Sequence, residues 1–559
     1  MFRVGIAVAL LLLAGRIVYV QAIPNSSYAK YGQQEQQVLV PVSPLRGDIY
    51  DRNGQIIAMS VGTKTVVADP KNVTHPMSES EKLSSLLNLN QSQVYHQLTQ
   101  KNQFDYVDQQ ISLSLAQKVV ALNLPGIATI NSATRIYPTS TLLESLVGRT
   151  DINGNGISGL EKQYNSLLGG SPGYDEILTS PVGELPGGLH VLQPVKNGKG
   201  LVLSLDQSLQ LRIQELLTKQ ILATDSLSGT AAVMDTRTGE ILAMDSVVSV
   251  NHITSNIPSN MILGQNNGSY VLPTSDPMAL TFVYEPGSVM KITTFSGALE
   301  NGIITPQTQL NIPPYLTLFG YRFADAEPHG DETLTAAQVL QQSSNIGTIE
   351  IAEKLGAPMV YHMQSLFGFG HLTGLSFPGE SAGILKPLSQ WSGTAIGSTP
   401  IGQDTGVTVL QLLAAFNTLA NGGVYITPKL VDGIVNSDGS VAKTSPSPTK
   451  RLIPEWVDQE MISMMKGVVS NNGTAPLAAI PGYQVAGKTG TAQVPGNGTD
   501  QYLPGKFDAT FAGFAPANNP ALTCVVMFQE PNGYYGGSES APIFSQIMQY
   551  ALHLYHIAP

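Results

Sequence analysis

Residues 285–291 of the chain place a serine and a lysine three positions apart, directly after a Pro-Gly turn. An α-helix turns once in about 3.6 residues, so Ser288 and Lys291 are expected to share one face at the start of a helix that ends near Glu300. An amine that reaches a hydroxyl can activate it as a base, provided that the amine is neutral. Free N–H groups at a helix start also favour an oxyanion. This segment therefore predicts a serine nucleophile with a lysine base.

The spacing of serine and lysine is not specific by itself. It recurs at Ser27/Lys30, Ser440/Lys443, Ser447/Lys450 and Ser463/Lys466. Only the first pair follows a Pro-Gly turn, which places the serine at the beginning of a helix.

A second polar segment contains Ser343 and Asn345. Two residues at this spacing in a tight turn can point into one cleft, where one relays a proton and the other holds an amide. A polar helix cap is the alternative interpretation, and Ser470/Asn472 repeats the pattern. The pattern is weak on its own.

The third segment, residues 487–492, reads Gly-Lys-Thr-Gly-Thr-Ala within a run predicted to form a strand over 484–493. Lys488 offers a positive charge for a carboxylate, and Gly490 would let a substrate backbone approach closely. An edge lysine that deters aggregation is the structural alternative. The three segments in this order are more specific than any one of them.

Composition bounds the possible functions. The chain has 559 residues, 42% hydrophobic content and a formal net charge of -11, without a Lys/Arg cluster. Several domains are expected, and nucleic acid is excluded as a partner. Charged residues make up 12% of the chain, about half of the usual 25%. We hypothesise that this low charge suits an acidic exterior, which a pH-activity profile that peaks at or above neutrality would oppose. The single cysteine, Cys524, is predicted to be buried in a strand.

The apolar pattern predicts the organisation of the chain. Residues 4–20 are almost long enough to span a bilayer, and we interpret them as an uncleaved anchor, with a cleaved signal peptide as the alternative. Asn53-Gly54 predicts a hairpin turn. Strands are predicted over 229–235 and 240–244, a surface loop over 251–277, mainly helices over 334–420, strands over 509–514 and 521–528, and a last helix over 542–556.

The ordered triple of Ser288-x-x-Lys291, Ser343-x-Asn345 and Lys488-Thr489-Gly490 resembles the signature of penicillin-binding proteins and serine β-lactamases. The whole chain is similar to class B penicillin-binding proteins, the monofunctional peptidoglycan D,D-transpeptidases. Further matching motifs are Arg46-Gly47 through Ala58, Gly159-Leu160-Glu161, Gly402-Gln403 and Ala420 through Gly423. Asp404-Thr405-Gly406 departs from the usual continuation after Gly-Gln.

The resemblance implies a mixed α/β (α+β) fold. It would comprise a transmembrane anchor at 1–22, an elongated α+β pedestal domain of the dimerisation type at 33–200 and a connector at 201–228. The transpeptidase domain, at 229–557, would have a mixed sheet of five strands and a helical subdomain. The chain would then be a single-pass cell-membrane protein with its bulk outside the cytoplasm.

The resemblance also implies roles for the residues. Ser288 would attack the penultimate D-alanine of a stem pentapeptide, and Lys291 would take the serine proton. Ser343 would relay a proton to the leaving amine, and Asn345 would hold Lys291 and the substrate amide. The remaining implied roles are carboxylate binding by Lys488, Thr489 and Thr491 beside Gly490, and an oxyanion hole from the backbone N–H groups of Ser288 and Thr491. No metal or cofactor is implied. Lys291 needs a lowered pKa, for which we expect burial and the charge of Lys488.

Three functions remain open. The first is a cross-linking transpeptidase that β-lactam antibiotics inhibit covalently. The second is a carboxypeptidase or β-lactamase-like hydrolase, in which water resolves the acyl-enzyme. The third is a scaffold that activates a membrane glycan polymerase of the SEDS type, alongside other divisome proteins at the cytoplasmic membrane. Residues 377–383 and the Trp391 segment favour the septal, cell-division branch over the elongation branch.

Overall fold

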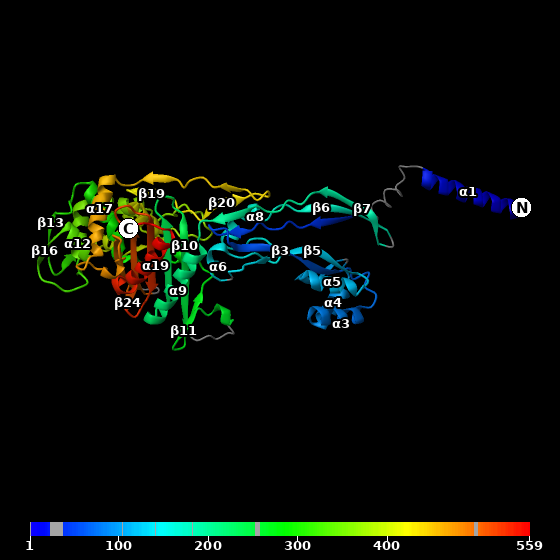
Figure 1. Cartoon of the computed structure of the whole chain (residues 1–559), viewed down its shortest axis with the longest axis horizontal. Helices are drawn as coiled ribbons and strands as arrows, with labels where there is room; N and C mark the ends of the chain where they lie inside the picture. The colour runs from blue at the N-terminus through cyan, green and yellow to red at the C-terminus, as the bar shows by residue number, and fades with distance from the viewer. Residues whose placement is uncertain are drawn as a thin grey trace. The chain divides into compact units, whose positions relative to one another are not determined.

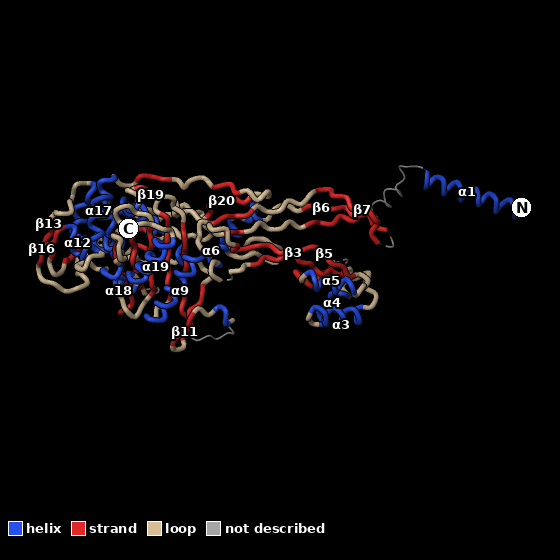
Figure 2. Tube along the Cα trace, in the orientation of Figure 1, coloured by secondary structure: helices blue, strands red, loops and turns tan. Residues whose placement is uncertain are grey.

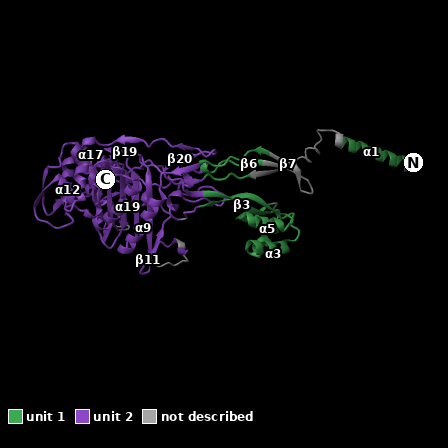
Figure 3. Cartoon of the chain, viewed as in Figure 1, with its two compact units in different colours: residues 1–47, 59–136, 166–199 green, residues 48–58, 137–165, 200–559 purple. Residues whose placement is uncertain are grey.

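The computed structural model describes residues 2–22, 37–102, 104–139, 141–180, 183–251, 258–496 and 501–559. The chain divides into two compact units (Figure 3). The first contains residues 1–47, 59–136 and 166–199, and the second contains residues 48–58, 137–165 and 200–559. The predicted domain limits stay predictions.

The apolar N-terminal segment forms helix α1 (Phe2–Ala22) in Figure 1. Within the described part of the chain, no helix combines the length and the apolar character that a membrane span requires.

The first unit contains two sheets with antiparallel pairing. One has the order β1 (Gln37–Val42), β6 (Gly173–Ser180) and β7 (Gly183–Gln193). In the other, the part of β3 (Ile56–Ala68) from residue 59 onward pairs with β4 (Asp105–Ile111) and β5 (Ile127–Ile136). Helices α3 (Pro76–Leu87), α4 (Gln91–Leu98) and α5 (Leu113–Ala121) accompany the second sheet (Figure 2). Their shared core contains Val66, Leu83, Val94 and Val119.

The second unit is built on a seven-stranded sheet. Its strand order is β11 (Gly264–Asn266), β12 (Ser269–Pro273), β10 (Ile241–Asn251), β9 (Ser228–Asp235), β25 (Leu522–Gln529), β24 (Tyr502–Ala515) and β23 (Ala486–Pro495). The predicted hairpin of the first two strands, β9 and β10, is confirmed. Strands from both ends of the unit meet where β9 pairs with β25, as predicted.

Two sequence predictions about this sheet are wrong. Every neighbouring pair is antiparallel, so the sheet is not mixed. The sheet also has seven strands where five were predicted, because the supposed loop at 251–277 contains β11 and β12. Residues 269–273 form a strand because they pair with residues 247–251 and because the side chain of Val271 is fully buried in the hydrophobic core. The mixed α/β class of the fold is confirmed.

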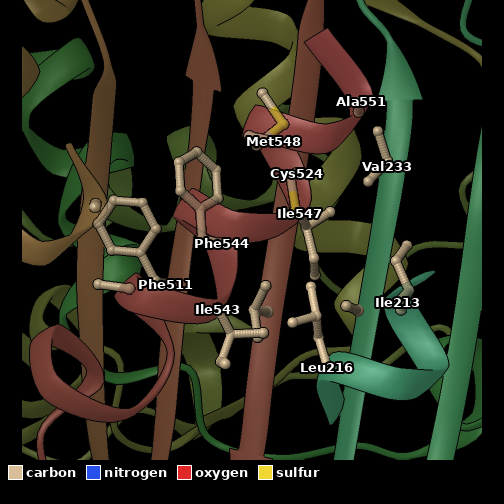
Figure 4. Packing of buried hydrophobic residues seen from close by; sticks show 14 of the residues in the cluster. Ile213, Leu216, Val233, Phe511, Cys524, Ile543, Phe544, Ile547, Met548 and Ala551 are labelled. Carbon is tan, nitrogen blue, oxygen red and sulfur yellow. The ribbon is translucent and has the colours of Figure 1, made fainter. Parts of the chain in front are cut away.

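Helices α9 (Gln207–Thr224) and α19 (Ala541–Leu554) pack against this sheet. Figure 4 shows Ile213 and Leu216 of α9 beside Val233 of β9, with Ile547 and Met548 of α19 in the same cluster. Cys524 lies among them and is fully buried, as predicted. Burial raises the pKa of its thiol, so this cysteine is an apolar packing residue.

A second group of helices carries the polar segments picked out in the sequence. It contains α11 (Lys291–Glu300), α12 (Ala336–Gln342), α13 (Asn345–Leu355), α14 (Ala357–Leu366), α16 (Val409–Ala420) and α17 (Glu455–Val468). Helix α11 is buried from Lys291 to Leu299, and α16 is buried along its whole length. The predominance of helices over 334–420 is confirmed; short strands β17 (Ile384–Leu385) and β18 (Thr405–Gly406) interrupt it.

Candidate active site

Ser288 lies on a short 3₁₀ turn, η2 (Gly287–Met290), and Lys291 is the first residue of α11. A helix start at Pro286-Gly287 is therefore confirmed, with a tighter turn than the sequence predicted. In 3₁₀ geometry residues three apart are eclipsed, which keeps Ser288 and Lys291 on one face. Ser288 is half-buried, whereas Lys291 is fully buried.

Three glycines allow the nucleophile turn to pack tightly. A Cβ atom on Gly490 would lie 2.5 Å from the carbonyl oxygen of Pro286, and one on Gly402 would lie 2.0 Å from that of Gly287. Gly287 has a φ of +59°, which favours glycine, and its N–H donates to the Gly402 oxygen at 3.1 Å. The turn is thus fixed between β23 and η4 (Thr399–Ile401). Gly490 is required for this packing, whatever it contributes to substrate approach.

The Lys291 amine is held by three oxygen atoms. Its Nζ donates to the Ser343 carbonyl oxygen at 2.6 Å, to Asn345 Oδ1 at 2.9 Å and to Ser343 Oγ at 3.3 Å. Among the described residues, the Ser288 hydroxyl forms no hydrogen bond with this amine. Catalytic hydrogen bonds are often long or unformed without substrate, so the arrangement still places a base one 3₁₀ turn from the serine.

Ser343 and Asn345 come from the junction of α12 and α13. Ser343 ends α12 with a left-handed φ of 62°, and Asn345 begins α13. The sharp reversal brings the Ser343 hydroxyl and the Asn345 amide toward the same amine. A helix cap is also present, but the capping residue is Ser344, whose Oγ accepts from Gly347 N at 3.0 Å. The segment therefore contains the helix cap of the alternative interpretation, on Ser344, and also points Ser343 and Asn345 to one place; the roles of these two residues stay predictions.

Lys488 reaches the same group from β23, the edge strand of the sheet. Its Nζ donates to Ser343 Oγ at 2.8 Å and to Thr489 Oγ1 at 3.1 Å. The Ser343 hydroxyl therefore lies between two amines. Lys488 is fully buried, so the alternative of an exposed edge lysine that deters aggregation is wrong.

The predicted threonines occupy neighbouring positions on β23. Thr489 Oγ1 lies 2.9 Å from Thr474 Oγ1, and Thr491 Oγ1 accepts from the backbone N–H of Gly536 at 3.2 Å. The backbone of Thr491 lies against Gly287, next to Ser288. The structure thus brings every predicted site residue from Ser288 to Thr491 into one group, reached from η2, the α12–α13 junction and β23.

Burial controls the charge of both lysines. It lowers the pKa of Lys291 from its usual value to about 7, and the carboxylate of Asp325 opposes this shift. Burial also lowers the pKa of Lys488 well below its usual range, and the positive charge of Lys291 lowers it further. We expected burial and the charge of Lys488 to lower the pKa of Lys291; burial does lower it, whereas the lowering does not come from Lys488. Neutral Lys291 is thus available near neutral pH.

Two carboxylates at the site were missed in the sequence. Asp325 accepts from Ser344 Oγ at 2.7 Å and from the backbone N–H of Ile346 at 3.0 Å. Glu285 accepts from the Asp404 N–H and from Tyr502 Oη, both at 2.9 Å. Burial raises the pKa of Glu285 to about 7. Glu285 could have been noticed because it precedes the Pro-Gly turn, whereas nothing in the sequence marks Asp325.

Comparison with known proteins agrees with this geometry. The penicillin-binding protein transpeptidase domain matches residues 229–549, and the penicillin-binding protein dimerisation domain matches residues 41–203. Together they cover the greater part of the chain. The chain belongs to the penicillin-binding protein transpeptidase family.

Individual relatives refine the class. The chain is 31% identical to peptidoglycan D,D-transpeptidase FtsI of Escherichia coli, over 99% of this chain and 91% of that protein. It is 30% identical to penicillin-binding protein PbpB of Mycobacterium tuberculosis, over 98% of this chain and 83% of that protein. These relatives are class B penicillin-binding proteins of the septal type, the class that the sequence predicted.

Solved structures give the same result. The crystal structure of penicillin-binding protein 3 from Mycobacterium tuberculosis, complexed with aztreonam, has a TM-score of 0.71 and 27% sequence identity. The similarity covers 93% of this chain and 98% of that one. The predicted class of enzyme, a penicillin-binding transpeptidase, is confirmed.

Proposed function

We propose that the chain is a peptidoglycan D,D-transpeptidase that cross-links stem peptides during cell-wall synthesis at division. The observation that carries this proposal is the fully buried Lys291 amine, with a pKa lowered to about 7, one 3₁₀ turn from Ser288 within the transpeptidase domain. A buried amine of this pKa is a base suited to neutral pH.

The first half of the reaction forms an acyl-enzyme. Ser288 Oγ attacks the carbonyl carbon of the penultimate D-alanine, and neutral Lys291 takes the hydroxyl proton. Backbone N–H groups of Ser288 and Thr491 stabilise the oxyanion, each such donor being worth roughly 10²–10³ in rate. As the carbon–nitrogen bond breaks, the Ser343 hydroxyl passes a proton to the leaving nitrogen and recovers one from the protonated Lys291. Terminal D-alanine leaves.

The second half of the reaction makes the cross-link. The amine of a neighbouring stem attacks the acyl-enzyme carbonyl, loses a proton to Lys291 and releases Ser288 with its hydroxyl restored. Before terminal D-alanine leaves in the first half, Lys488, Thr489 and Thr491 bind its carboxylate in this proposal, while Asn345 holds Lys291 and the substrate amide. The position of the Ser343 hydroxyl, 3.3 Å from one amine and 2.8 Å from the other, supports the proton relay.

The location of the enzyme belongs to the same proposal. The N-terminal segment at 1–22 would anchor the chain in the cytoplasmic membrane; the support for this is the sequence alone, in which residues 4–20 are apolar except for Gly5, Gly15, Arg16 and Tyr19. The transpeptidase domain would then act outside the cytoplasm. A SEDS-type glycan polymerase and other divisome proteins are its proposed partners.

A fluorescent penicillin tests the proposed chemistry. We expect the detergent-solubilised full chain to form a covalent adduct that peptide mapping places on Ser288 and that Ser288→Ala abolishes. A β-lactam should acylate the serine in the same way as the stem peptide, without a leaving group to diffuse away. Rapid turnover of the penicillin would instead favour the hydrolase alternative. Full viability of cells that carry Ser288→Ala would favour the scaffold alternative.

A further inference from the structure

We propose that Asp325 is a positioning residue, which fixes Ser344 and Asn345 and, through Asn345, the Lys291 amine. The inference rests on the acyl transfer proposed above and deepens it. Asp325 stands in the loop between β15 (Tyr321–Phe323) and β16 (Glu332–Thr335), about 20 positions before the residues that it contacts.

The contacts fix the backbone of the α12–α13 junction. Oδ1 of Asp325 accepts hydrogen bonds from the backbone N–H groups of Asn345 and Ile346, and Oδ2 accepts one from Ser344 Oγ. The carboxylate thus satisfies two of the free N–H groups at the start of α13, a helix of 11 residues, where negative charge is favourable. The carboxylate therefore holds residues 344–346 in this backbone arrangement.

Ala324, the residue before Asp325, fixes the side chain of Asn345. Nδ2 of Asn345 donates to the carbonyl oxygen of Ala324 at 3.1 Å, while Oδ1 of Asn345 accepts from Lys291 Nζ at 2.9 Å. An amide has one donor end and one acceptor end, so donation to Ala324 turns the acceptor toward the lysine. Residues 324 and 325 therefore determine both the place and the orientation of the group that holds the base.

The charge of Asp325 acts on the same amine. Its carboxylate opposes the lowering of the Lys291 pKa that burial causes. Other charged groups face this pair. Lys488 of β23 lies on the other side of Ser343, and His329 Nε2 lies 3.2 Å from Asp325 Oδ2. Glu332 of β16 lies 3.5 Å from His329 Nδ1. Of these groups, Asp325 is the carboxylate that contacts the helix start.

The experiment compares variants that separate charge from position. Asp325→Asn keeps the shape and removes the charge, Asp325→Ala removes both, and Asp325→Glu restores the charge. Asp331→Asn, at an exposed position of the same loop, is the matched control. For each full-length variant, the rate constant of acylation by the fluorescent penicillin is measured from pH 5 to pH 9, together with the thermal unfolding midpoint.

We expect Asp325→Asn to lower the acylation rate at its plateau by about 10-fold, because an amide cannot accept from all of these donors. The acid limb, which is the part of the pH–rate profile where acylation rises with pH, should move to lower pH by roughly half a unit or more. The reason is that the loss of a nearby negative charge lowers the Lys291 pKa. Asp325→Ala should lose more activity, and Asp325→Glu should recover the wild-type limb. The profile of Asp331→Asn should match that of the wild type.

Two results would overturn the inference. One is an acylation rate of Asp325→Asn within twofold of the wild type, with the acid limb at the wild-type pH. The other is a lower unfolding midpoint with an unmoved limb, which would make Asp325 a helix cap and nothing more. An NMR titration of ¹³Cε-labelled lysines, assigned with Lys291→Arg, reads the Lys291 pKa without substrate. It therefore tests Asp325 even if no adduct forms on Ser288, a result that would refute the proposed function alone.

Discussion

Two regions of the second unit carry the same pair of short patterns. The site has Ser-x-x-Lys at η2–α11 and Ser-x-Asn at the α12–α13 junction. Helix α17 and the turn after it repeat both, as Ser463/Lys466 and Ser470/Asn472. The comparison separates what a pattern contributes from what its surroundings contribute, because the residue types and the spacing are identical.

The surroundings differ in burial and in backbone geometry. Ser463 is exposed on a regular α-helix and Lys466 is half-buried, whereas Lys291 is fully buried at a 3₁₀–α junction. Ser470 donates to the carbonyl oxygen of Gly467 at 2.6 Å. Ser343, in contrast, has left-handed backbone geometry and lies between two amines. Chemistry therefore depends on desolvation and on convergent partners from other elements.

The largest expected effect is the loss of the buried base. Lys291→Ala should lower the rate of acylation by about 10³-fold, within the range typical of a general base. Lys466→Ala should leave it within twofold of the wild type. Stopped-flow measurement with the fluorescent penicillin checks both variants. Equal losses would mean that burial does not distinguish the two lysines.

The amide that holds this base gives the next largest effect. Asn345→Ala should lower acylation by about 10²-fold, because a buried lysine loses one of three acceptors and moves. Asn472→Ala, at an exposed position, should have no measurable effect. If Asn345→Ala lowered only the unfolding midpoint and left the acylation rate unchanged, this expectation would be contradicted.

The tight packing around the nucleophile turn predicts a smaller loss. Gly490→Ala would bring a Cβ atom to 2.5 Å from the Pro286 carbonyl, so the turn must shift. We expect about 10-fold slower acylation and destabilisation of about 1–3 kcal/mol. Gly330→Ala is the control, since its Cβ would meet nothing within 4 Å. Unchanged acylation in Gly490→Ala would show that the turn tolerates displacement.

The sequence predicted the site better than it predicted the sheet. Ser288, Lys291, Ser343, Asn345 and Lys488 were found because each lies in a short linear pattern beside a glycine turn, a helix start or an apolar strand. Local patterns also predicted the β9–β10 hairpin. The small strands β11 and β12 were missed because a polar, glycine-rich stretch pairs through its backbone alone, with one buried valine.

The contacts of the residues that support the site were not predictable for a related reason. Asp325 contacts the α12–α13 junction across about 20 positions, and Glu285 contacts Asp404 across 119. Their roles depend on which loops meet in the fold. The cause of the Lys291 pKa shift was predicted only in part: burial was expected and is confirmed, but the opposing carboxylate of Asp325 was missed because it comes from a distant loop.

The pH dependence of catalysis bears on the acidic-exterior hypothesis. Because the Lys291 pKa is about 7, the fraction of neutral base rises as pH increases through 7. Acylation should therefore increase by about 10-fold in total from pH 6 to pH 8, with most of the rise below pH 7. A rate that peaks below pH 6 would support the acidic-exterior hypothesis and refute the role of Lys291 as the base.

The smallest expected effect concerns a buried carboxyl in the region that repeats the patterns. Burial raises the pKa of Asp458, on α17, to about 8, and its side chain is almost fully buried. Its folded pKa lies above its unfolded pKa, so its contribution to stability is complete below about pH 4 and is lost as pH rises through 8. Asp458→Asn removes this titration, since an amide stays neutral.

The unfolding midpoint should therefore fall less in Asp458→Asn than in the wild type when the pH is raised from 5 to 8. We expect the two decreases to differ by a few degrees. The buried lysines titrate in the variant as in the wild type, so their contribution cancels in this comparison. Glu460→Gln, also on α17, is the control. A variant with the same pH slope as the wild type would mean that Asp458 stays ionised in the folded chain.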